Sequence, residues 1–279
     1  MKGGMKMPEL PEVETVKRVV EPQIKGKRIL HIKIENPQVI EYPDSDKFVE
    51  MIEGSTVTGM FRRGKFLGID LEDKNRIVLH FRMTGSLIVA PKGYPIEKHT
   101  HVIMELDDGN EIRYVDPRRF GRLWFLGEEE DTYTRMDRLG LEPFDNMLTR
   151  EYLIDNLGQK KKKIKECLLD QSVVTGIGNI YADEILFECK INPTKKACEL
   201  LEEEWIMLAE KIPEVLSYFI DKNAISKEDY LAGKGKDYRN TPYLKVYGHE
   251  GEPCPICGEN LCKVVITGRS SVYCPSCQK

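Results

Sequence analysis

Four cysteines near the end of the 279-residue chain have the spacing of a metal site. Cys254-Pro-Ile-Cys257 and Cys274-Pro-Ser-Cys277 are separated by 16 residues. Each pair presents two sulfurs to one ion, and two such pairs complete a tetrahedral zinc site. Because four thiolates leave no open coordination position, the sequence predicts one structural Zn²⁺. A redox dithiol is the alternative, but it requires one pair and does not explain two.

A polar turn between the two cysteine pairs presents an arginine. The segment Thr267-Gly268-Arg269-Ser270-Ser271 is flanked by β-forming residues, which predicts a hairpin with Arg269 at its tip. From spacing alone, an ordinary surface arginine is the alternative. Three further cysteines fall in helical stretches of the sequence and are expected as small buried side chains: Cys167, Cys189 and Cys198.

Basic residues gather in short runs although the whole chain is acidic, with 42 Lys+Arg against 46 Asp+Glu. The runs lie at 62–65, 118–122, 160–165 and 234–245. A local field attracts a polyanion even where the total charge is negative, so these runs allow a nucleic-acid-binding face. The alternative is that each run is only a solvated surface.

Composition excludes several classes of protein. No apolar stretch approaches the roughly 18 residues that a membrane-spanning helix needs. The first twenty residues have no apolar segment of the kind that a secretion signal contains. With eight cysteines, such a chain is expected to hold reduced thiols or a metal in the cytoplasm.

Hydrophobic periodicity predicts the elements that must position these groups. Residues 11–25 have a helical pattern that ends at Gly26. From 28 to 126, short β-forming runs are separated by turn signals, which predicts an antiparallel sandwich or barrel with one short helix at 43–53. The clearest of these runs are 30–34, 76–81, 101–106, 111–115 and 122–126.

The pattern becomes helical after about residue 135. Pro213 is expected to kink or break the last helix near Glu210, and residues 223–243, rich in Gly and Lys, are expected to form a mobile loop. The predicted helices are 148–157, 164–169, 179–189 and 199–219.

Several motifs, in order along residues 7–279, resemble the formamidopyrimidine-DNA glycosylases, bacterial enzymes that remove oxidised purines such as 8-oxoguanine. The resemblance implies an α+β fold with an N-terminal antiparallel β-sandwich and flanking helix (7–135), a helical helix-two-turn-helix DNA-binding domain (136–230) and a four-cysteine zinc finger (245–279). It also implies a monomer that acts on damaged double-stranded DNA. Among the motifs are Met7-Pro8-Glu9-Leu10-Pro11-Glu12, Asp116-Pro117-Arg118-Arg119-Phe120-Gly121 and Gly176-Ile177-Gly178-Asn179.

The resemblance assigns catalytic roles to four residues. Pro8 matches the amino-terminal proline whose amine attacks the sugar C1′ and forms a Schiff base. Glu9 matches the general acid/base, Lys65 the proton donor of β-elimination, and Arg269 the arginine that supports δ-elimination. From the residues alone, Lys65 is expected as an ordinary lysine in an edge strand. The implied reaction is base excision followed by β,δ-elimination, the activity of a bifunctional DNA glycosylase (a hydrolase) and AP lyase.

Base flipping explains a second set of residues. Flipping costs a few kcal/mol and leaves a void in the duplex. Met83, Arg118 and Phe120 match the residues that fill it, although core packing is the alternative for Met83 and Phe120. The residues that match DNA-binding positions are His99, Arg118, Lys160 and Asn179.

Two of the predicted DNA-binding features have a local geometry. The glycines of the 176–179 turn let backbone N–H groups approach a phosphate at a helix N-terminus, and Asn179 adds a donor. His99 and His101 are expected two apart on one strand and facing solvent, with a metal-binding pair as the alternative.

Six residues precede Met7, and with them Pro8 is an amide that cannot attack C1′. Our hypothesis is that translation starts at Met7, because Lys2-Gly3-Gly4 can be encoded by a purine-rich ribosome-binding sequence. A retained extension instead implies a non-catalytic DNA-damage-binding protein. A third hypothesis is an endonuclease VIII-like glycosylase for oxidised pyrimidines. In each case the expected location is the bacterial cytoplasm, at the nucleoid.

Overall fold

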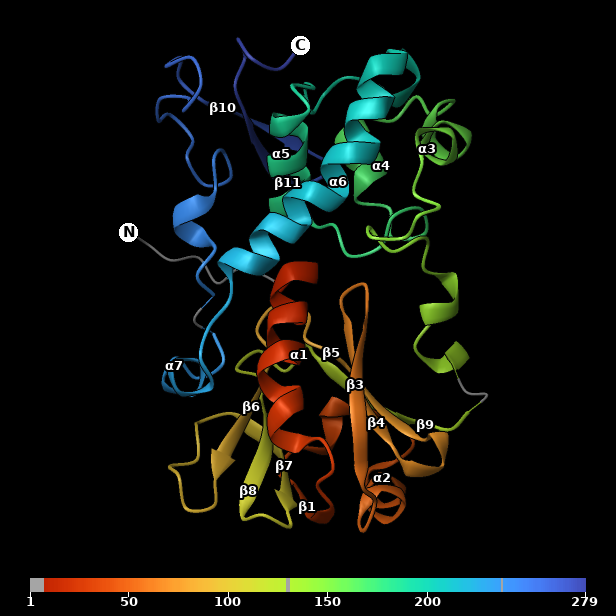
Figure 1. Cartoon of the computed structure of the whole chain (residues 1–279), viewed down its shortest axis with the longest axis vertical. Coiled ribbons are helices and arrows are strands. Elements are labelled where there is room, and N and C mark those ends of the chain that lie inside the picture. The colour runs from red at the N-terminus through yellow and green to blue at the C-terminus, as the bar shows by residue number, and fades with distance from the viewer. Residues whose placement is uncertain (1–7, 129–130, 237) are drawn as a thin grey trace. The chain divides into compact units, whose positions relative to one another are not determined.

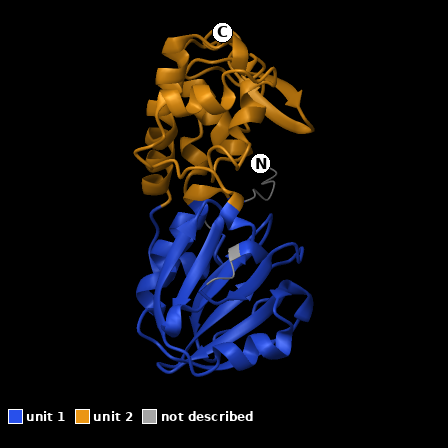
Figure 2. Cartoon of the chain, turned by 90° about the vertical axis from the view of Figure 1, so that its right-hand side faces the viewer, with its two compact units in different colours: residues 1–8, 12–137, 224–238 blue, residues 9–11, 138–223, 239–279 orange. Residues whose placement is uncertain are grey.

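The computed structural model describes residues 8–128, 131–236 and 238–279, which divide into two compact units (Figure 2). Unit 1 holds Pro8, residues 12–137 and residues 224–238, and unit 2 holds residues 9–11, 138–223 and 239–279. Each unit has its own hydrophobic core, and the zinc-finger region of unit 2 has a small core of its own. Over the described residues, no helix has both the length and the apolar character that crossing a membrane requires.

Unit 1 is a sandwich of two β-sheets. Its strands are β1 (Ile29–Ile34), β2 (Ile40–Tyr42), β3 (Val57–Arg63), β4 (Phe66–Leu71), β5 (Arg76–His80), β6 (Ser86–Pro91), β7 (Thr100–Leu106), β8 (Asn110–Val115) and β9 (Arg122–Leu126). One sheet has the order β1-β7-β8-β6 and the other β2-β9-β5-β4-β3. The pairs are antiparallel except β2 with β9, which is parallel. The predicted sandwich is confirmed, and it contains four strands beyond the predicted runs: β2, β3, β4 and β6.

Alternate side chains of the strands fill the space between the two sheets. Leu67 and Ile69 of β4 and Ile77 and Leu79 of β5 are fully buried in one core. The predicted helices are confirmed as α1 (Leu10–Ile24) and α2 (Ser45–Ile52). Both bury one apolar face in the same core, which accounts for the period of their apolar residues.

The prediction that residues 223–243 form a loop is wrong for the middle of the segment. They contain α7 (Lys227–Ala232), which begins where the Ser226 side chain accepts a hydrogen bond from Asp229 N at 3.1 Å. Tyr230 is only 2% exposed and lies in the sandwich core, where its hydroxyl donates to Leu87 O at 3.1 Å. One buried aromatic side chain therefore anchors a segment whose composition is otherwise that of a loop.

Four helices build unit 2, and all four were predicted (Figure 1). α6 is one helix through Pro213, so of the two predicted outcomes the break is absent, whereas its ribbon bends along its length, in agreement with a kink. Proline removes one backbone donor, and the buried side chains of Ile212 and Leu216 hold the helix on the core at this point. The helices are α3 (Arg150–Leu157), α4 (Ile164–Leu168), α5 (Asn179–Glu188) and α6 (Glu202–Lys222).

The predicted hairpin near the C-terminus is confirmed as β10 (Cys262–Ile266) and β11 (Arg269–Tyr273). Its turn residues Thr267 and Gly268 have φ angles of 46° and 76°, the left-handed conformation that matches the twist of a tight hairpin. Cys167 and Cys189 are buried as expected, whereas Cys198 is exposed because it lies in a single 3₁₀ turn at the surface. Such turns span Pro37–Val39, Glu72–Lys74, Asp131–Tyr133, Met136–Arg138, Ala197–Glu199 and Thr241–Tyr243.

Candidate active site

The Glu9 carboxylate lies at the amino-terminal end of α5. Its Oε2 accepts hydrogen bonds from Gly178 N at 2.9 Å and Tyr181 N at 3.3 Å, and its Oε1 accepts one from Ile180 N at 3.0 Å. The side chain is 1% exposed. Backbone N–H groups and the helix dipole at this end favour a negative charge. The structure therefore fixes an ionised carboxylate directly after Pro8, which is itself buried.

Two glycines make room for this arrangement. A Cβ atom at Gly178 would lie 2.2 Å from Glu9 Cδ, so any side chain there would displace the carboxylate. Gly176 has a φ of 89°, and its carbonyl oxygen accepts a hydrogen bond from Leu10 N at 3.2 Å. Three N–H groups at this helix start thus bind Glu9, where the sequence suggested that they approach a phosphate.

Arg269 is exposed at the start of β11, and the residue that follows it is held by two donors. Asn179 Nδ2 and Lys165 Nζ each donate to Ser270 O at 3.0 Å. Unit 2 therefore brings the predicted residues Asn179 and Arg269 together through the backbone of the hairpin. Lys160 is not among them, and its ammonium lies 3.5 Å from a carboxylate oxygen of Asp170.

Lys65 lies in the two-residue turn between β3 and β4, so the prediction of a strand position is wrong. Arg63 pairs with Phe66 across the hairpin, and Gly64 has a φ of 56°, which a turn requires. Burial lowers the pKa of His80 from 6.5 to about 3, and the charges of Arg82 and Lys65 add to this effect. The turn thus places the Lys65 ammonium near a neutral imidazole.

The three predicted void-filling residues lie outside the sandwich core. Met83 is half-buried in a turn after β5, and Arg118 and Phe120 lie in the segment between β8 and β9. Phe120 is 46% exposed, and the Arg118 guanidinium carbon lies 4.7 Å from the centre of its ring. Such a stack holds both side chains together at the surface, so the alternative of core packing is wrong for Phe120 and Met83.

One buried carboxylate, Asp116, holds the turns that carry these residues. It accepts hydrogen bonds from Gly121 N at 2.8 Å, from Arg118 N at 3.2 Å and from the hydroxyl groups of Tyr114 and Thr84. Burial and the nearby carboxylate raise the pKa of Tyr114 far above its ordinary value, so its hydroxyl stays a donor. Asp116 had no predicted role, although an acid directly after an apolar strand was a usable signal.

The two histidines have different positions from those predicted. His99 is exposed in a turn with a φ of 71°, and only His101 belongs to β7. His101 is 6% exposed, and its Nε2 lies 2.8 Å from Asp116 O. His101 is on the face of β7 opposite to the core residues Val102 and Met104, but both faces of this strand are buried. The prediction of two solvent-facing histidines on one strand is therefore wrong.

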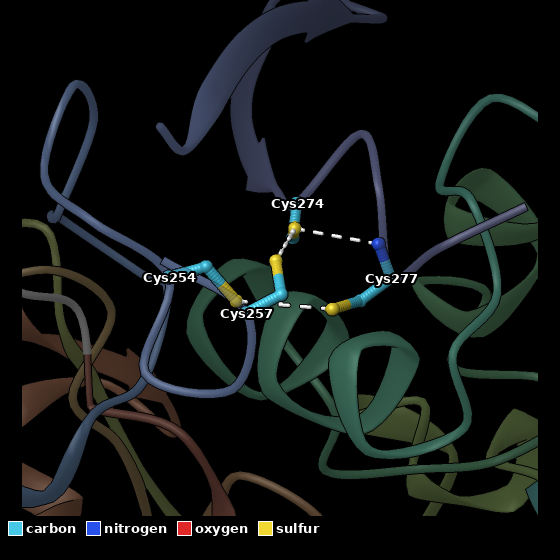
Figure 3. Close-up of side chains that lie close together, drawn as sticks. All are labelled: Cys254, Cys257, Cys274 and Cys277. Carbon is cyan, nitrogen blue, oxygen red and sulfur yellow. Dashed lines mark hydrogen bonds between the residues drawn. The ribbon is translucent and has the colours of Figure 1, made fainter. Parts of the chain in front are cut away.

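The four cysteines of the two pairs converge in unit 2 (Figure 3). The Sγ atoms of Cys254 and Cys277 are 3.9 Å apart, those of Cys257 and Cys274 are 3.5 Å apart, and all four lie within 4.8 Å of one another. A tetrahedral zinc ion with Zn–S bonds of about 2.3 Å requires sulfurs about 3.8 Å apart. The sulfurs therefore fit one structural Zn²⁺, and no other potential metal-binding group of three or more side chains occurs in the described residues.

Three family models match successive parts of the chain: the formamidopyrimidine-DNA glycosylase N-terminal domain at residues 7–123, the H2TH domain of these enzymes at 139–230, and a zinc finger found in FPG and IleRS at 251–279. The formamidopyrimidine-DNA glycosylase of Desulforamulus reducens is 42% identical over 275 residues, which cover 98% of this chain and 99% of that protein.

Relatives from other bacteria are similar over the same length. The Bacillus cereus (strain ATCC 10987) enzyme is 41% identical over 275 residues, again 98% of this chain and 99% of that protein. A crystal structure of the Lactococcus lactis enzyme with DNA that contains an oxidised pyrimidine superimposes with a TM-score of 0.89 at 34% identity, and the match covers 98% of this chain and 100% of that chain. The same protein with DNA that contains an abasic site gives a TM-score of 0.86 at 33% identity, with coverage of 98% and 100%.

Proposed function

The chain belongs to the formamidopyrimidine-DNA glycosylase family, and we propose that it excises oxidised purines from damaged double-stranded DNA and then cleaves the strand. It is a base-excision repair enzyme, a DNA glycosylase with AP lyase activity. The expected lesions are 8-oxoguanine and formamidopyrimidines. A monomer working on chromosomal DNA in the bacterial cytoplasm is part of the same proposal.

Access to the damaged base requires that its nucleotide leave the stack, which costs a few kcal/mol. Phe120 and Met83 supply apolar wedges for the vacated space, and Arg118 supplies hydrogen-bond donors to the orphaned base. The buried carboxylate of Asp116 supports these roles, because it accepts hydrogen bonds both from the turn that carries Met83 and from the segment that carries Arg118 and Phe120. A wedge on a fixed turn loses little conformational entropy when it enters the duplex.

In the chemical steps, the Pro8 amine attacks the sugar C1′ while the bond from C1′ to the base breaks. Glu9 accepts the proton of the amine and returns it to O4′ as the C1′–O4′ bond breaks and the sugar ring opens. The C1′=N iminium that results withdraws electrons for elimination. Lys65 donates a proton in β-elimination, and Arg269 binds the phosphate beside the lesion and supports δ-elimination. The observation that carries the proposal is the Glu9 carboxylate, fixed by three N–H groups at the residue after Pro8.

The remaining predicted residues bind DNA. His99 and Lys160 contact phosphates through cationic or polar side chains, and Asn179 does so beside the hairpin. The zinc ion is structural: it supplies folding free energy to a segment with a small core and takes no part in the chemical steps. In this proposal, residues 7–135 form the catalytic domain, residues 136–230 the DNA-binding domain and residues 245–279 the zinc finger.

Borohydride trapping on an 8-oxoguanine duplex tests the proposal, because only a Schiff base becomes covalently linked to DNA. One protein begins at Pro8, and a second begins at Met1 and carries Met7→Leu so that the extension is retained. The first is expected to become linked and to cut the strand, whereas the second does neither because its Pro8 nitrogen is an amide.

Each alternative has its own outcome in this experiment. Binding without linkage by both proteins would support a DNA-damage-binding protein. Since the Lactococcus lactis enzyme forms a complex with DNA that contains an oxidised pyrimidine, a duplex with such a base is the second substrate. Faster excision of the pyrimidine than of 8-oxoguanine would reject the proposed preference. A Pro8-terminal protein that leaves both duplexes uncut would reject the enzyme mechanism.

A further inference from the structure

α5 carries a buried carboxylate, Asp183, that the proposed reaction does not use. Asp183 Oδ1 lies 2.6 Å from Lys165 Nζ, and both side chains are 0% exposed. A buried ion pair adds little net stability compared with well-packed apolar side chains. The role of this pair is therefore better inferred from the groups that it orients through hydrogen bonds than from its contribution to stability.

These contacts reach the strand that carries Arg269. Ser271 Oγ donates to Asp183 Oδ1 at 2.6 Å, and Val272 N donates to Asp183 Oδ2 at 3.0 Å. Lys165 Nζ, the other member of the pair, donates to Ser270 O at 3.0 Å. A single ion pair, formed by Lys165 of α4 and Asp183 of α5, therefore binds all three residues that follow Arg269.

The residues that precede Arg269 form the turn of the hairpin. Arg269 follows the two-residue turn at the hairpin tip, and Ile266, its partner across the turn, belongs to the same hairpin. The zinc ligand Cys274 lies five residues further along the chain, beyond the end of β11. The position of the Arg269 backbone relative to α5, where Glu9 is bound, therefore depends on the contacts of residues 270–272.

We propose that Asp183 is a positioning residue for δ-elimination: it holds β11 on α5 so that the Arg269 guanidinium reaches the phosphate beside the lesion. The inference rests on the proposed function of Arg269. An ionised carboxylate suits this role because its two oxygens accept from a side chain and from the backbone at once. Ser271, fully buried beside it, extends the same contact.

The test compares two products from an abasic-site duplex, the β-elimination product and the β,δ-elimination product, together with borohydride trapping. Asp183→Asn keeps the shape of the side chain but replaces one carboxylate oxygen with an NH₂ group. Losing charge-assisted hydrogen bonds should displace β11. We therefore expect the δ-to-β product ratio to fall about tenfold, with less than a twofold change in trapping. Ser271→Ala removes one donor and keeps the ion pair, so we expect about a threefold decrease.

Two reference variants accompany these. Arg269→Ala is expected to lower the same ratio at least as far as Asp183→Asn. Glu204→Gln changes another carboxylate of unit 2 that binds a lysine, Lys195 at 2.7 Å, and is expected to leave the ratio unchanged. Zinc content and thermal unfolding show whether each variant is folded.

An unchanged ratio in a folded, zinc-loaded Asp183→Asn protein would overturn the inference. A parallel decrease of trapping and ratio would also overturn it, because it would assign Asp183 to the fold as a whole. If Asp183→Asn does not fold, an unchanged ratio in Ser271→Ala decides against the proposal. Arg269→Ala with an unchanged ratio would remove the proposed role of Arg269 and this inference with it, whereas failure of the Asp183 variant alone leaves the proposed function standing.

Discussion

Gly178→Ala tests the placement of Glu9 with a single added methyl group. The backbone at Gly178 has φ −126° and ψ −159°, an extended conformation, so alanine brings no left-handed strain. The new Cβ would lie 2.2 Å from Glu9 Cδ and 2.4 Å from Oε1. Carbon atoms pack at about 3.5–4.0 Å. The carboxylate must therefore retreat by more than about 1 Å, which breaks its hydrogen bonds to the start of α5.

Two free energies follow from this displacement. Hydrogen bonds to a charged group contribute about 1.5–3 kcal/mol each. Water can replace part of these hydrogen bonds at a helix end, so we expect the free energy of unfolding to decrease by about 1–3 kcal/mol in total. A misplaced general acid/base costs about 100- to 10,000-fold in rate. Single-turnover excision on an 8-oxoguanine duplex should fall by this factor, whereas urea unfolding should change only modestly.

A matched control and a double-mutant cycle separate this mechanism from general damage. Gly59→Ala places its Cβ at ordinary distances, 3.5 Å from Glu21 Oε1 and 3.9 Å from Asp70 Oδ2, and should preserve both activity and stability. In a Glu9→Ala background the methyl at position 178 meets no carboxylate, so its cost in stability should disappear. Excision within about threefold of wild type in folded Gly178→Ala would refute the reasoning, as would an equal loss of stability in both backgrounds.

Three further predictions concern other parts of the chain. Cys274→Ser should abolish stoichiometric zinc binding and strand cleavage, measured by metal analysis and a nicking assay, because the module lacks a core that folds without the ion. The pKa of His80 is about 3 when the protein is folded and 6.5 when the side chain is free. The contribution of this residue to the free energy of unfolding should therefore be complete above pH 6.5 and be lost as the pH decreases toward 3. His80→Gln should recover about 1–2 kcal/mol of that loss at pH 5 in urea unfolding. Phe120→Ala should slow excision from duplex DNA about tenfold but leave cleavage of a single-stranded abasic site unchanged, because only the duplex must be unstacked.

The helices and the zinc module could be predicted because their signals lie within a few residues. Helical periodicity and the two cysteine pairs are local patterns, and their elements formed as expected. The position of Lys65 depended on one glycine with positive φ, a weak local signal. Anchoring of α7 depended on Tyr230, whose hydrogen-bond partner Leu87 lies 143 residues away in sequence. Such long-range packing is invisible to local periodicity.

The buried acids that position the site residues were not predicted from the sequence. Catalytic and void-filling residues came from resemblance, but the groups that hold them are carboxylates: Asp116 beneath the void-filling turns and Asp183 beneath the hairpin. Sequence patterns place acids at the surface by default. Here each acid adjoins or interrupts an apolar run, as Asp183 does within α5, where residues 180–187 are all buried.

These buried carboxylates share one physical task. Glu9, Asp116 and Asp183 each accept backbone N–H groups of a segment at the edge of a core: a helix start, a turn and a hairpin strand. An apolar side chain would stabilise such a segment without fixing its orientation, because dispersion is not directional. An ionised carboxylate in a low-dielectric surrounding is directional, and its loss leaves unsatisfied donors. The residues proposed to contact DNA therefore lie on surface segments whose backbones are fixed by buried carboxylates.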